Sequence, residues 1–151
     1  MNRSLILSCF ILAVVIMIPI TGCAGENQSN SNEVIFEQLI SHPEKYNSKN
    51  ITLEAFYFHG FEIIVLSDTL KYSGYAEGHL IPDGELIWIE GGIPLEVYNQ
   101  LTQQQMMGTD ERYGKVRVKG KFEYGGSYGH VGGYRFQIIP SVVELLPWSP
   151  D

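Results

Sequence analysis

The sequence is poor in the residues that most often cross-link small domains or build reactive sites. It has two cysteines, Cys9 and Cys23, both near the start of the chain, so nothing after Cys23 carries a thiol. Disulfides, thiolate metal ligands and a cysteine nucleophile are therefore excluded for the rest of the chain. Basic residues are also scarce, with 10 Lys and Arg against 17 Asp and Glu and a formal net charge of −7. Phosphate backbones repel such a chain, which makes nucleic acid an unfavourable partner.

Four histidines could in principle ligate a metal, but their spacing does not favour a site. Zinc sites need three or four ligands that converge, and these often come in close pairs along the chain. The histidines are instead far apart: His42, His59, His79 and His130. We expect them to be solvent-exposed in turns and loops, and we expect neither a metal nor a cofactor.

Nucleophilic catalysis has no recognisable motif in this sequence. Ser67 and Asp68 could be combined with His79 or His130, but no serine lies in the strand–turn–helix context of a nucleophile elbow. The glycine-rich segment 125–133 lacks the Lys-Ser/Thr pair of a phosphate-binding loop, and it precedes an expected strand rather than a helix. The sequence therefore favours a protein that is not an enzyme.

The start of the chain has the layout of an export signal. Arg3 supplies a positive charge, an apolar run follows over residues 5–20, and residues 25–32 form a polar tract. The apolar run is shorter than the roughly 20 residues that a transmembrane helix needs. This order of charged, apolar and small residues is typical of a secretory signal.

The residues that end the apolar run, Ile20-Thr21-Gly22-Cys23, resemble the lipobox of bacterial lipoproteins. The resemblance implies that diacylglycerol is attached to Cys23, that the chain is cleaved before it, and that the new amine is acylated, commonly with palmitate. Several acyl chains hold a protein on a bilayer stably where a single chain does not. The sequence then divides into a signal peptide (1–22), a lipidated cysteine with a flexible tether (23–32) and one domain (33–151).

An uncleaved membrane anchor is the alternative to a cleaved lipoprotein signal. Pro19 and the Thr21-Gly22 pair would serve a spanning helix poorly, because proline and glycine lower helix stability. Both alternatives place the domain outside the cytoplasm, in the cell envelope and next to a membrane.

The composition of residues 33–151 is typical of short strands and turns. The chain contains nine tyrosines, seven phenylalanines and 16 glycines, and this mixture favours β-structure over a helical bundle. Removal of Arg3 with the signal peptide makes the net charge −8. We expect one mainly β domain with a single core.

Alternating apolar residues and turn residues predict the order of elements in this domain. A short helix begins at the cap residue Asn32 and ends at Pro43. Glycine at position 120 predicts a bend or bulge within the fourth strand. The other expected elements are strands over 51–58, 61–67, 85–90, 115–124 and 134–139, a tight turn at His59-Gly60, loops over 68–84 and 125–133, a helix from Pro94 to Met106, a break at Pro140 and an edge segment over 142–146.

A helix between the third and fourth of five strands is the arrangement of the OB-fold, a five-stranded Greek-key barrel. The segment 42–56 supports this interpretation, since Pro43, Tyr46 and Lys49 precede a strand in a pattern that resembles the opening of OB-fold-like domains in exported bacterial proteins. Ala55 stands where those domains usually have glycine. We therefore expect a small five-stranded OB-like barrel, which informs the fold far more than the function.

The fourth strand separates an apolar face from a charged face. Alternate residues from Val116 to Tyr124 are expected to point inward, and those from Lys115 to Glu123 outward. The outward row is mostly basic: Lys115, Arg117, Lys119 and Lys121. It is either an ordinary solvated face or a docking stripe for acidic head groups or an acidic partner.

The expected contact site follows from the OB interpretation, because OB-folds bind ligands on the strand 2–3 face and on the 1–2 and 4–5 loops. The candidate contact residues near the last of these loops are Tyr124, Tyr128, His130 and Tyr134. The sequence favours a membrane-tethered, non-catalytic binding module whose partner is an envelope protein or a saccharide. An oligosaccharide- or nucleic-acid-binding domain is the alternative, with the charge opposing nucleic acid, and an enzyme of unrecognised type comes third.

Overall fold

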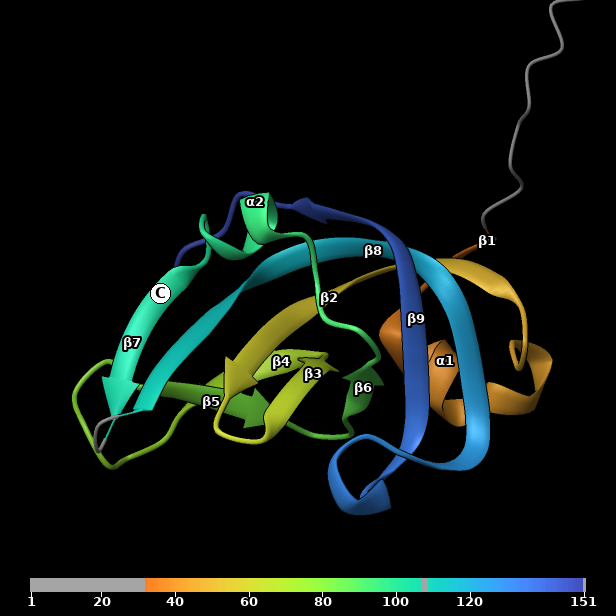
Figure 1. Ribbon diagram of the computed structural model, residues 1–151, viewed down its shortest axis with the longest axis horizontal. Helices are drawn as coiled ribbons and strands as arrows, with labels where there is room; N and C mark the ends of the chain where they lie inside the picture. The colour runs from red at the N-terminus through yellow and green to blue at the C-terminus, as the bar shows by residue number, and fades with distance from the viewer. Residues whose placement is uncertain (1–31, 107–108, 151) are drawn as a thin grey trace, which may run out of the picture.

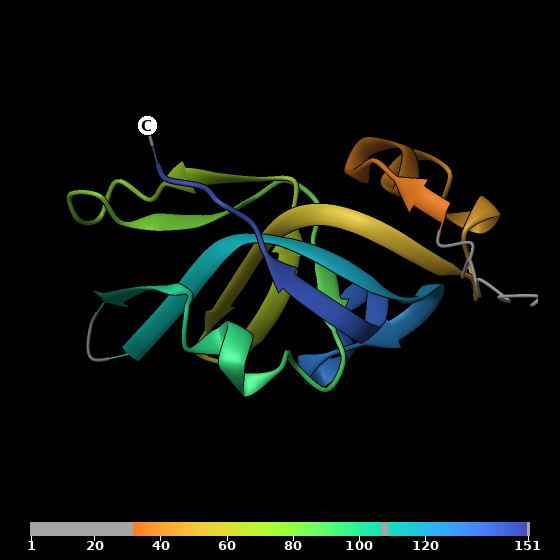
Figure 2. The same cartoon turned by 90° about the horizontal axis from the view of Figure 1, so that it is seen from above.

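The computed structural model describes residues 32–106 and 109–150, so the expected signal peptide, Cys23 and most of the tether lie outside the described residues. The described part is mainly β (Figures 1 and 2). Within it, no helix is long and apolar enough to cross a bilayer. Its strands are β1 (Asn32–Val34), β2 (Asn50–Gly60), β3 (Ile63–Ser67), β4 (Thr69–Tyr72), β5 (Leu80–Asp83), β6 (Ile87–Ile89), β7 (Thr102–Met106), β8 (Thr109–Tyr128) and β9 (Tyr134–Leu145). Its helices are α1 (Phe36–Ser41) and α2 (Leu95–Tyr98), with 3-10 turns η1 (Pro43–Lys45) and η2 (His130–Gly132).

Five strands form a closed ring of hydrogen-bonded neighbours. The main sheet has the order β1-β2-β3-β6-β9-β8-β7, and a further pairing joins β2 to β8. Figure 1 shows β8 curving away from β2 to run beside β9. Within the ring, β6 and β9 are parallel and the other neighbours are antiparallel. The ring contains the five strands that the sequence predicts, while β1 and β7 extend the sheet at its two ends.

The main core lies inside this ring. Val116, Val118 and Phe122 of β8 are fully buried, and so are Leu53 of β2 and Ile138 of β9. The alternate residues of β8 are half-buried or exposed. The inward and outward faces predicted for the fourth strand are therefore confirmed.

Gly120 marks the predicted irregularity in β8. A Cβ atom at this position would collide with the carbonyl oxygen of Ile139, and the β8–β9 register shifts between Lys119 and Gly120. The expected irregularity is thus present, but its extra residue is Ser141 of β9, because Gly120 pairs with Pro140 and Lys119 with Val142. Glycine is required at position 120 by the close approach of β9. The break expected at Pro140 is wrong, because β9 continues to Leu145. Proline is tolerated next to this bulge, where the regular ladder of hydrogen bonds is already interrupted.

The segment expected as a loop over residues 68–84 contains a β-hairpin instead. β4 and β5 pair antiparallel as a separate two-stranded sheet, and Figure 2 shows this hairpin as a layer beside β2. It covers the outer face of β2 and β3, where a second buried cluster consists of Phe58, Val65, Leu80 and Tyr113. The sequence obscures the hairpin because its strands are four residues long and mix apolar residues with charged residues and proline.

The helix expected from Pro94 to Met106 is wrong beyond its first turn. α2 ends at Tyr98, Leu101 is buried where the chain leaves it, and the following β7 pairs with β8. Gln103 and its glutamine neighbours are good helix formers in isolation. Pairing with β8 therefore overrides the local helix propensity of this segment.

The N-terminal helix is present, but it is not capped as expected. Asn32 lies in β1, and Ile35 occupies the N-cap position without a side-chain hydrogen bond. Phe36 and Leu39 are buried in the main core. Burial of one apolar face, rather than a cap, therefore stabilises α1.

Candidate functional site

Two turns that are far apart in the sequence meet in the structure. The β2–β3 turn consists of Phe61 and Glu62, because β2 continues through His59 and Gly60, the expected turn residues. Oε2 of Glu62 lies 3.3 Å from Nε2 of His130 in η2. This contact brings the β2–β3 turn against the β8–β9 turn.

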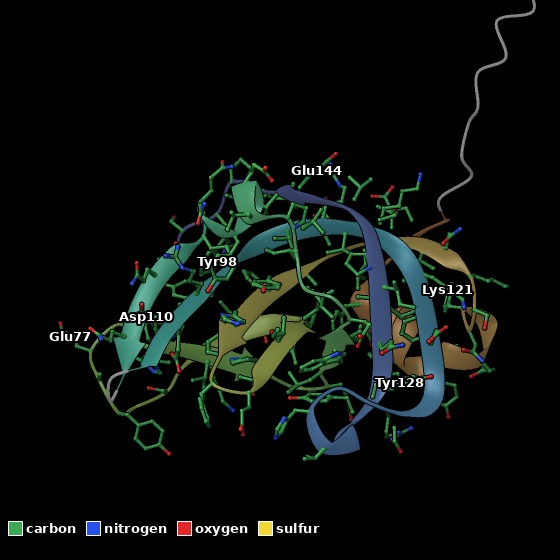
Figure 3. The ribbon with its side chains drawn as sticks, in the orientation of Figure 1. Glu77, Tyr98, Asp110, Lys121, Tyr128 and Glu144 are labelled. Atoms are coloured by element: carbon green, nitrogen blue, oxygen red, sulfur yellow. The ribbon has the colours of Figure 1, made fainter. Side chains whose placement is uncertain are left out.

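The β8–β9 turn is shorter than the loop expected over 125–133, because β8 runs on to Tyr128 (Figure 3). The turn begins at Gly129, which has φ 68° and ψ −160°, a conformation that is essentially restricted to glycine. A Cβ atom on Gly129 would also lie 2.5 Å from the Trp88 ring and 2.7 Å from the Tyr134 ring. Glycine at this position therefore lets the turn close directly onto two aromatic side chains.

An open groove of about 210 Å³ lies between these two turns, and we call it the turn groove. The indole of Trp88 forms part of its wall and packs against Tyr134, with ring centroids 5.2 Å apart and planes inclined by 37°. The indole N–H donates a hydrogen bond of 3.0 Å to Glu90. The groove is lined by His59, Gly60, Glu62, Ile63, Ile64, Trp88 and His130. It thus offers part of the Trp88 indole, one carboxylate and two imidazoles, with neither lysine nor arginine among the lining residues.

His59 lines the turn groove and is held in place by Tyr98. Its Nδ1 atom lies 2.9 Å from the hydroxyl of Tyr98, and the two rings are edge to face at 5.3 Å. The Arg112 guanidinium lies over the Tyr98 ring, 4.9 Å from the ring centroid. Burial lowers the pKa of His59, and the charge of Arg112 lowers it further. Both effects favour a neutral imidazole, which can donate through one nitrogen and accept through the other.

The four predicted contact residues do not form one site. His130 lines the turn groove, and Tyr134 lies behind it with its ring on Trp88. Tyr124 packs against the core inside the ring. Tyr128 is half-buried, and its ring lies over its own strand. The structure therefore places only His130 in the lining of the groove, and contact of these four residues with a ligand stays a prediction.

The sequence interpretation missed His59 and Trp88. The sequence around Trp88 could have identified it, because strand residues alternate between faces. Ile87 and Ile89 are fully buried on the inner face, so Trp88 between them faces outward. An outward tryptophan on a short strand is therefore a candidate contact residue. The sequence predicts His59 in a turn, whereas it lies in β2 and pairs with Ile64 of β3 and Arg112 of β8.

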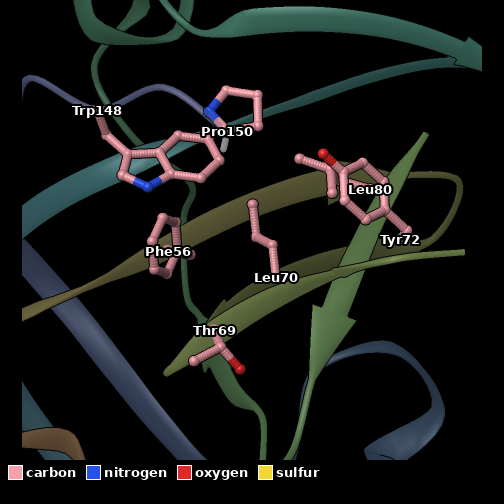
Figure 4. Close-up of a pocket in the computed structure, with 7 residues that line it drawn as sticks. All are labelled: Phe56, Thr69, Leu70, Tyr72, Leu80, Trp148 and Pro150. Atoms are coloured by element: carbon pink, nitrogen blue, oxygen red, sulfur yellow. The ribbon is translucent and has the colours of Figure 1, made fainter. Parts of the chain in front are cut away.

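A second groove, which we call the tail groove, lies between the β4–β5 hairpin and the C-terminal residues (Figure 4). Its volume is about 280 Å³. Trp148 packs edge-on against Phe56 at 4.9 Å and against Tyr113 at 6.2 Å, and it remains 37% exposed. The lining residues are mostly apolar: Phe56, Thr69, Leu70, Tyr72, Leu80, Trp148 and Pro150. These contacts fix the C-terminal segment beside β2.

His79 is buried, with 4% of its surface exposed, so the expectation of four exposed histidines is wrong. Its Nδ1 lies 2.8 Å from Oγ of Ser73, and its Nε2 lies 2.8 Å from Oε2 of Glu111. Gln104 donates a hydrogen bond of 2.8 Å to the same carboxylate oxygen. The cluster therefore connects the β4–β5 loop to β7 and β8.

A serine, a histidine and a carboxylate linked in this order also occur in nucleophilic active sites. The serine here is Ser73, whereas the sequence analysis considered Ser67. Ser67 is buried, and its hydroxyl donates to the carbonyl of Thr69 at 2.8 Å. Ser73 accepts the backbone N–H of Tyr75 at 3.1 Å and donates its own N–H to the carbonyl of His79 at 2.8 Å. Ser73 and His79 thus close the two ends of one loop, which is a structural role.

The basic row on β8 is paired with acidic residues. Nη2 of Arg117 lies 2.6 Å from Glu54, Nζ of Lys115 lies 3.5 Å from the same carboxylate, and Nζ of Lys121 lies 2.7 Å from Glu123. The hydrogen bond from Arg117 lowers the pKa of Glu54. The face therefore has mixed charge, which favours the solvated-surface interpretation over a basic docking stripe.

Among residues 32–106 and 109–150, no group of three or more histidine, cysteine or acidic residues is placed to hold a metal ion. No protein-family model, curated protein or solved structure matches the chain. The functional argument therefore depends on the chain's own residues.

Proposed function

We propose that the protein is a lipid-anchored lipoprotein of the cell envelope, and that its domain is an OB-like barrel that binds a ligand without catalysis. The lipobox-like residues 20–23 support the anchor. The ring order β2-β3-β6-β9-β8 and the position of α2 between β6 and β8 support an OB-like barrel. In such a barrel these strands correspond to the first, second, third, fifth and fourth.

The contact between the two turns is the observation that carries the binding role. The β2–β3 turn corresponds to the 1–2 loop of an OB-fold and the β8–β9 turn to the 4–5 loop, which are the loops that bind ligands there. Glu62 and His130 join them, and Trp88 lies between them. The β4–β5 hairpin covers much of the outer face of β2 and β3, whereas the turn groove is open to solvent.

The lining of the turn groove favours a neutral saccharide. A pyranose ring presents an apolar face that packs on an aromatic side chain, and its hydroxyls need donors and acceptors at the rim. The indole of Trp88 supplies the aromatic surface. The side chains of Glu62, His59 and His130 supply the hydrogen-bond donors and acceptors. An anionic ligand such as nucleic acid would meet an acidic domain and a groove without lysine or arginine.

Fluorescence of Trp88 tests this proposal directly. The chain has two tryptophans, so Trp148→Phe leaves Trp88 as the sole reporter. Titration with a panel of soluble glucose and N-acetylglucosamine oligomers should give a saturable change for at least one member. His130→Ala should weaken that binding at least tenfold. Tyr75→Ala, at an exposed position in the β4–β5 loop, is the matched control and should bind as the parent does.

The salt dependence separates a saccharide from an anionic ligand. Neutral saccharide binding releases no counterions and should hardly change over a roughly tenfold increase in salt, whereas nucleic-acid binding should collapse. The proposal is wrong if no oligosaccharide changes the fluorescence. It is also wrong if His130→Ala and Tyr75→Ala bind equally well.

A further inference from the structure

The two outer edges of the β4–β5 hairpin differ in how they are closed. On β5, the side-chain amide of Gln104 accepts the N–H of Leu80 at 3.0 Å and donates to its carbonyl at 2.6 Å. The next residue of β5 with outward backbone groups is Pro82, which has no N–H to offer. The β5 edge is therefore blocked against another strand.

On β4, the outward direction follows from the hairpin hydrogen bonds. The N–H of Ser73 donates to the carbonyl of His79, and Tyr72 lies opposite Leu80 in the ladder. In an antiparallel pair the hydrogen-bonded positions alternate, so Lys71 bonds to β5 and Leu70 directs its backbone N–H and carbonyl away from it. Among the strands of the described residues, β4 pairs with β5 alone.

This outer edge of β4 lies along the tail groove. Thr69, Leu70 and Tyr72 all line the groove. Figure 4 shows Leu70 between Phe56 and Trp148 on one side and Tyr72 and Leu80 on the other. No lysine, arginine, aspartate or glutamate lines it. An edge of backbone donors and acceptors thus lies beside an apolar trough.

We propose that the tail groove binds an extended polypeptide segment, which adds as a strand to the outer edge of β4. Backbone groups of the segment would pair with β4, and its alternate side chains, all facing one way, would enter the apolar trough. A saccharide or an acyl chain would leave the strand edge without matching donors and acceptors. β4 has four residues, so the bound segment spans about 13 Å, or roughly four residues. This site is separate from the turn groove and does not depend on saccharide binding.

A random-peptide display library, selected against the full-length chain in detergent micelles, is the first test. The selected peptides should share apolar residues at alternate positions. Synthetic versions of one such peptide should then be N-methylated at alternate backbone positions in two registers. Methylation in the register that faces β4 should weaken binding at least tenfold, and methylation in the other register should change it by less than about twofold.

A protein variant locates the site. Trp148→Ala should weaken the selected peptide at least fivefold while the far-ultraviolet circular dichroism stays unchanged, and Phe61→Ser in the β2–β3 turn should have no effect. The comparison of the two N-methylated peptides uses the unsubstituted protein. It therefore tests the proposal even if Trp148→Ala unfolds the domain. Failure to select any peptide, or peptides that are equally sensitive in both registers, would overturn the proposal. A concentration-dependent dimer without peptide selection would assign the β4 edge to a second copy of the chain instead.

Discussion

Oε2 of Glu62 and Nε2 of His130 lie 3.3 Å apart, and this pair forms a polar contact between the β2–β3 turn and the β8–β9 turn. Both side chains are about half exposed, at 51% and 46%, so the pair contributes at most about 1 kcal/mol to stability. The turns are therefore held mainly by their own strands and by packing on Trp88. Loss of the contact between Glu62 and His130 should therefore not unfold the site.

Substitution of Gly129 tests whether closure of the β8–β9 turn shapes the groove. Gly129→Ala introduces a Cβ atom against Trp88 and Tyr134 and places alanine in a backbone region that only glycine adopts readily. We expect a loss of about 2–3 kcal/mol in the free energy of unfolding, measured by urea denaturation. The Trp88 emission should also shift.

Gly125→Ala is the matched control for this prediction. Gly125 also has a positive φ, 87°, but a Cβ atom there would meet nothing within 4 Å. The cost should therefore be backbone strain alone, about 1 kcal/mol. Equal losses for the two variants would show that the packing of the turn on Trp88 contributes nothing.

The ring core can be tested on β8. Val118 is fully buried, so Val118→Asp places a carboxylate without a partner in the core and should cost several kcal/mol, on the order of 3 or more. Arg117 is partly exposed beside Glu54, and Arg117→Gln should leave the stability nearly unchanged, because exposed ion pairs contribute little. Thermal unfolding compares the two. Similar melting temperatures would mean that the inner and outer faces of β8 are misassigned.

The sequence predicts the ring better than it predicts what covers the ring. The alternation from Val116 to Phe122 is strong because one face is entirely buried and the other is charged, and the glycine at position 120 marks the bulge. The sequence does not predict β7, because its glutamines favour a helix locally. The segment forms a strand only through its pairing with β8.

The candidate site shows the same limit. The glycines at 129, 132 and 133 identify a turn, but its contacts come from residues distant in sequence. His79 illustrates this most clearly, because its burial depends on Glu111 and Gln104 from strands that the sequence does not place near it.

The pH dependence of stability should report on His59. Its pKa is lower in the folded protein than in the unfolded chain because of burial and, to a smaller extent, Arg112. As the pH falls through about 6.5, the ordinary value for histidine, the unfolded chain takes up the proton first, so stability decreases. Urea denaturation between about pH 7.5 and 5.5 should show a smaller decrease for His59→Gln than for the parent. Identical slopes would contradict a neutral, partly desolvated His59.

Lipidation of Cys23 is a prediction from the sequence alone. The mature N-terminus should be a cysteine that carries diacylglycerol, and mass spectrometry of the membrane-extracted protein would identify it. Cys23→Ser should block processing and leave the longer precursor, because the sulfur is the acceptor atom. A mature chain that begins elsewhere, with an unmodified cysteine, would remove the basis for a lipid anchor.

The Ser73–His79–Glu111 cluster provides the test of the non-catalytic assignment. A catalytic serine must offer an oxygen lone pair to its substrate, whereas Ser73 is half-buried and its Oγ accepts the N–H of Tyr75. We therefore expect no labelling of Ser73 by a fluorophosphonate, and equal background hydrolysis of p-nitrophenyl acetate by the parent and Ser73→Ala.

His79→Ala should instead affect stability. It removes two partly buried hydrogen bonds and leaves Glu111 with the amide of Gln104 as its remaining partner in this cluster. The expected cost is about 1–3 kcal/mol, since a buried acceptor that loses its donor is not compensated by water. Urea denaturation measures this loss, and Ser73→Ala should cost less because Ser73 is nearer to solvent. Labelling of Ser73 that disappears in His79→Ala would reverse the argument, because it would show a serine activated by histidine and make the protein a hydrolase.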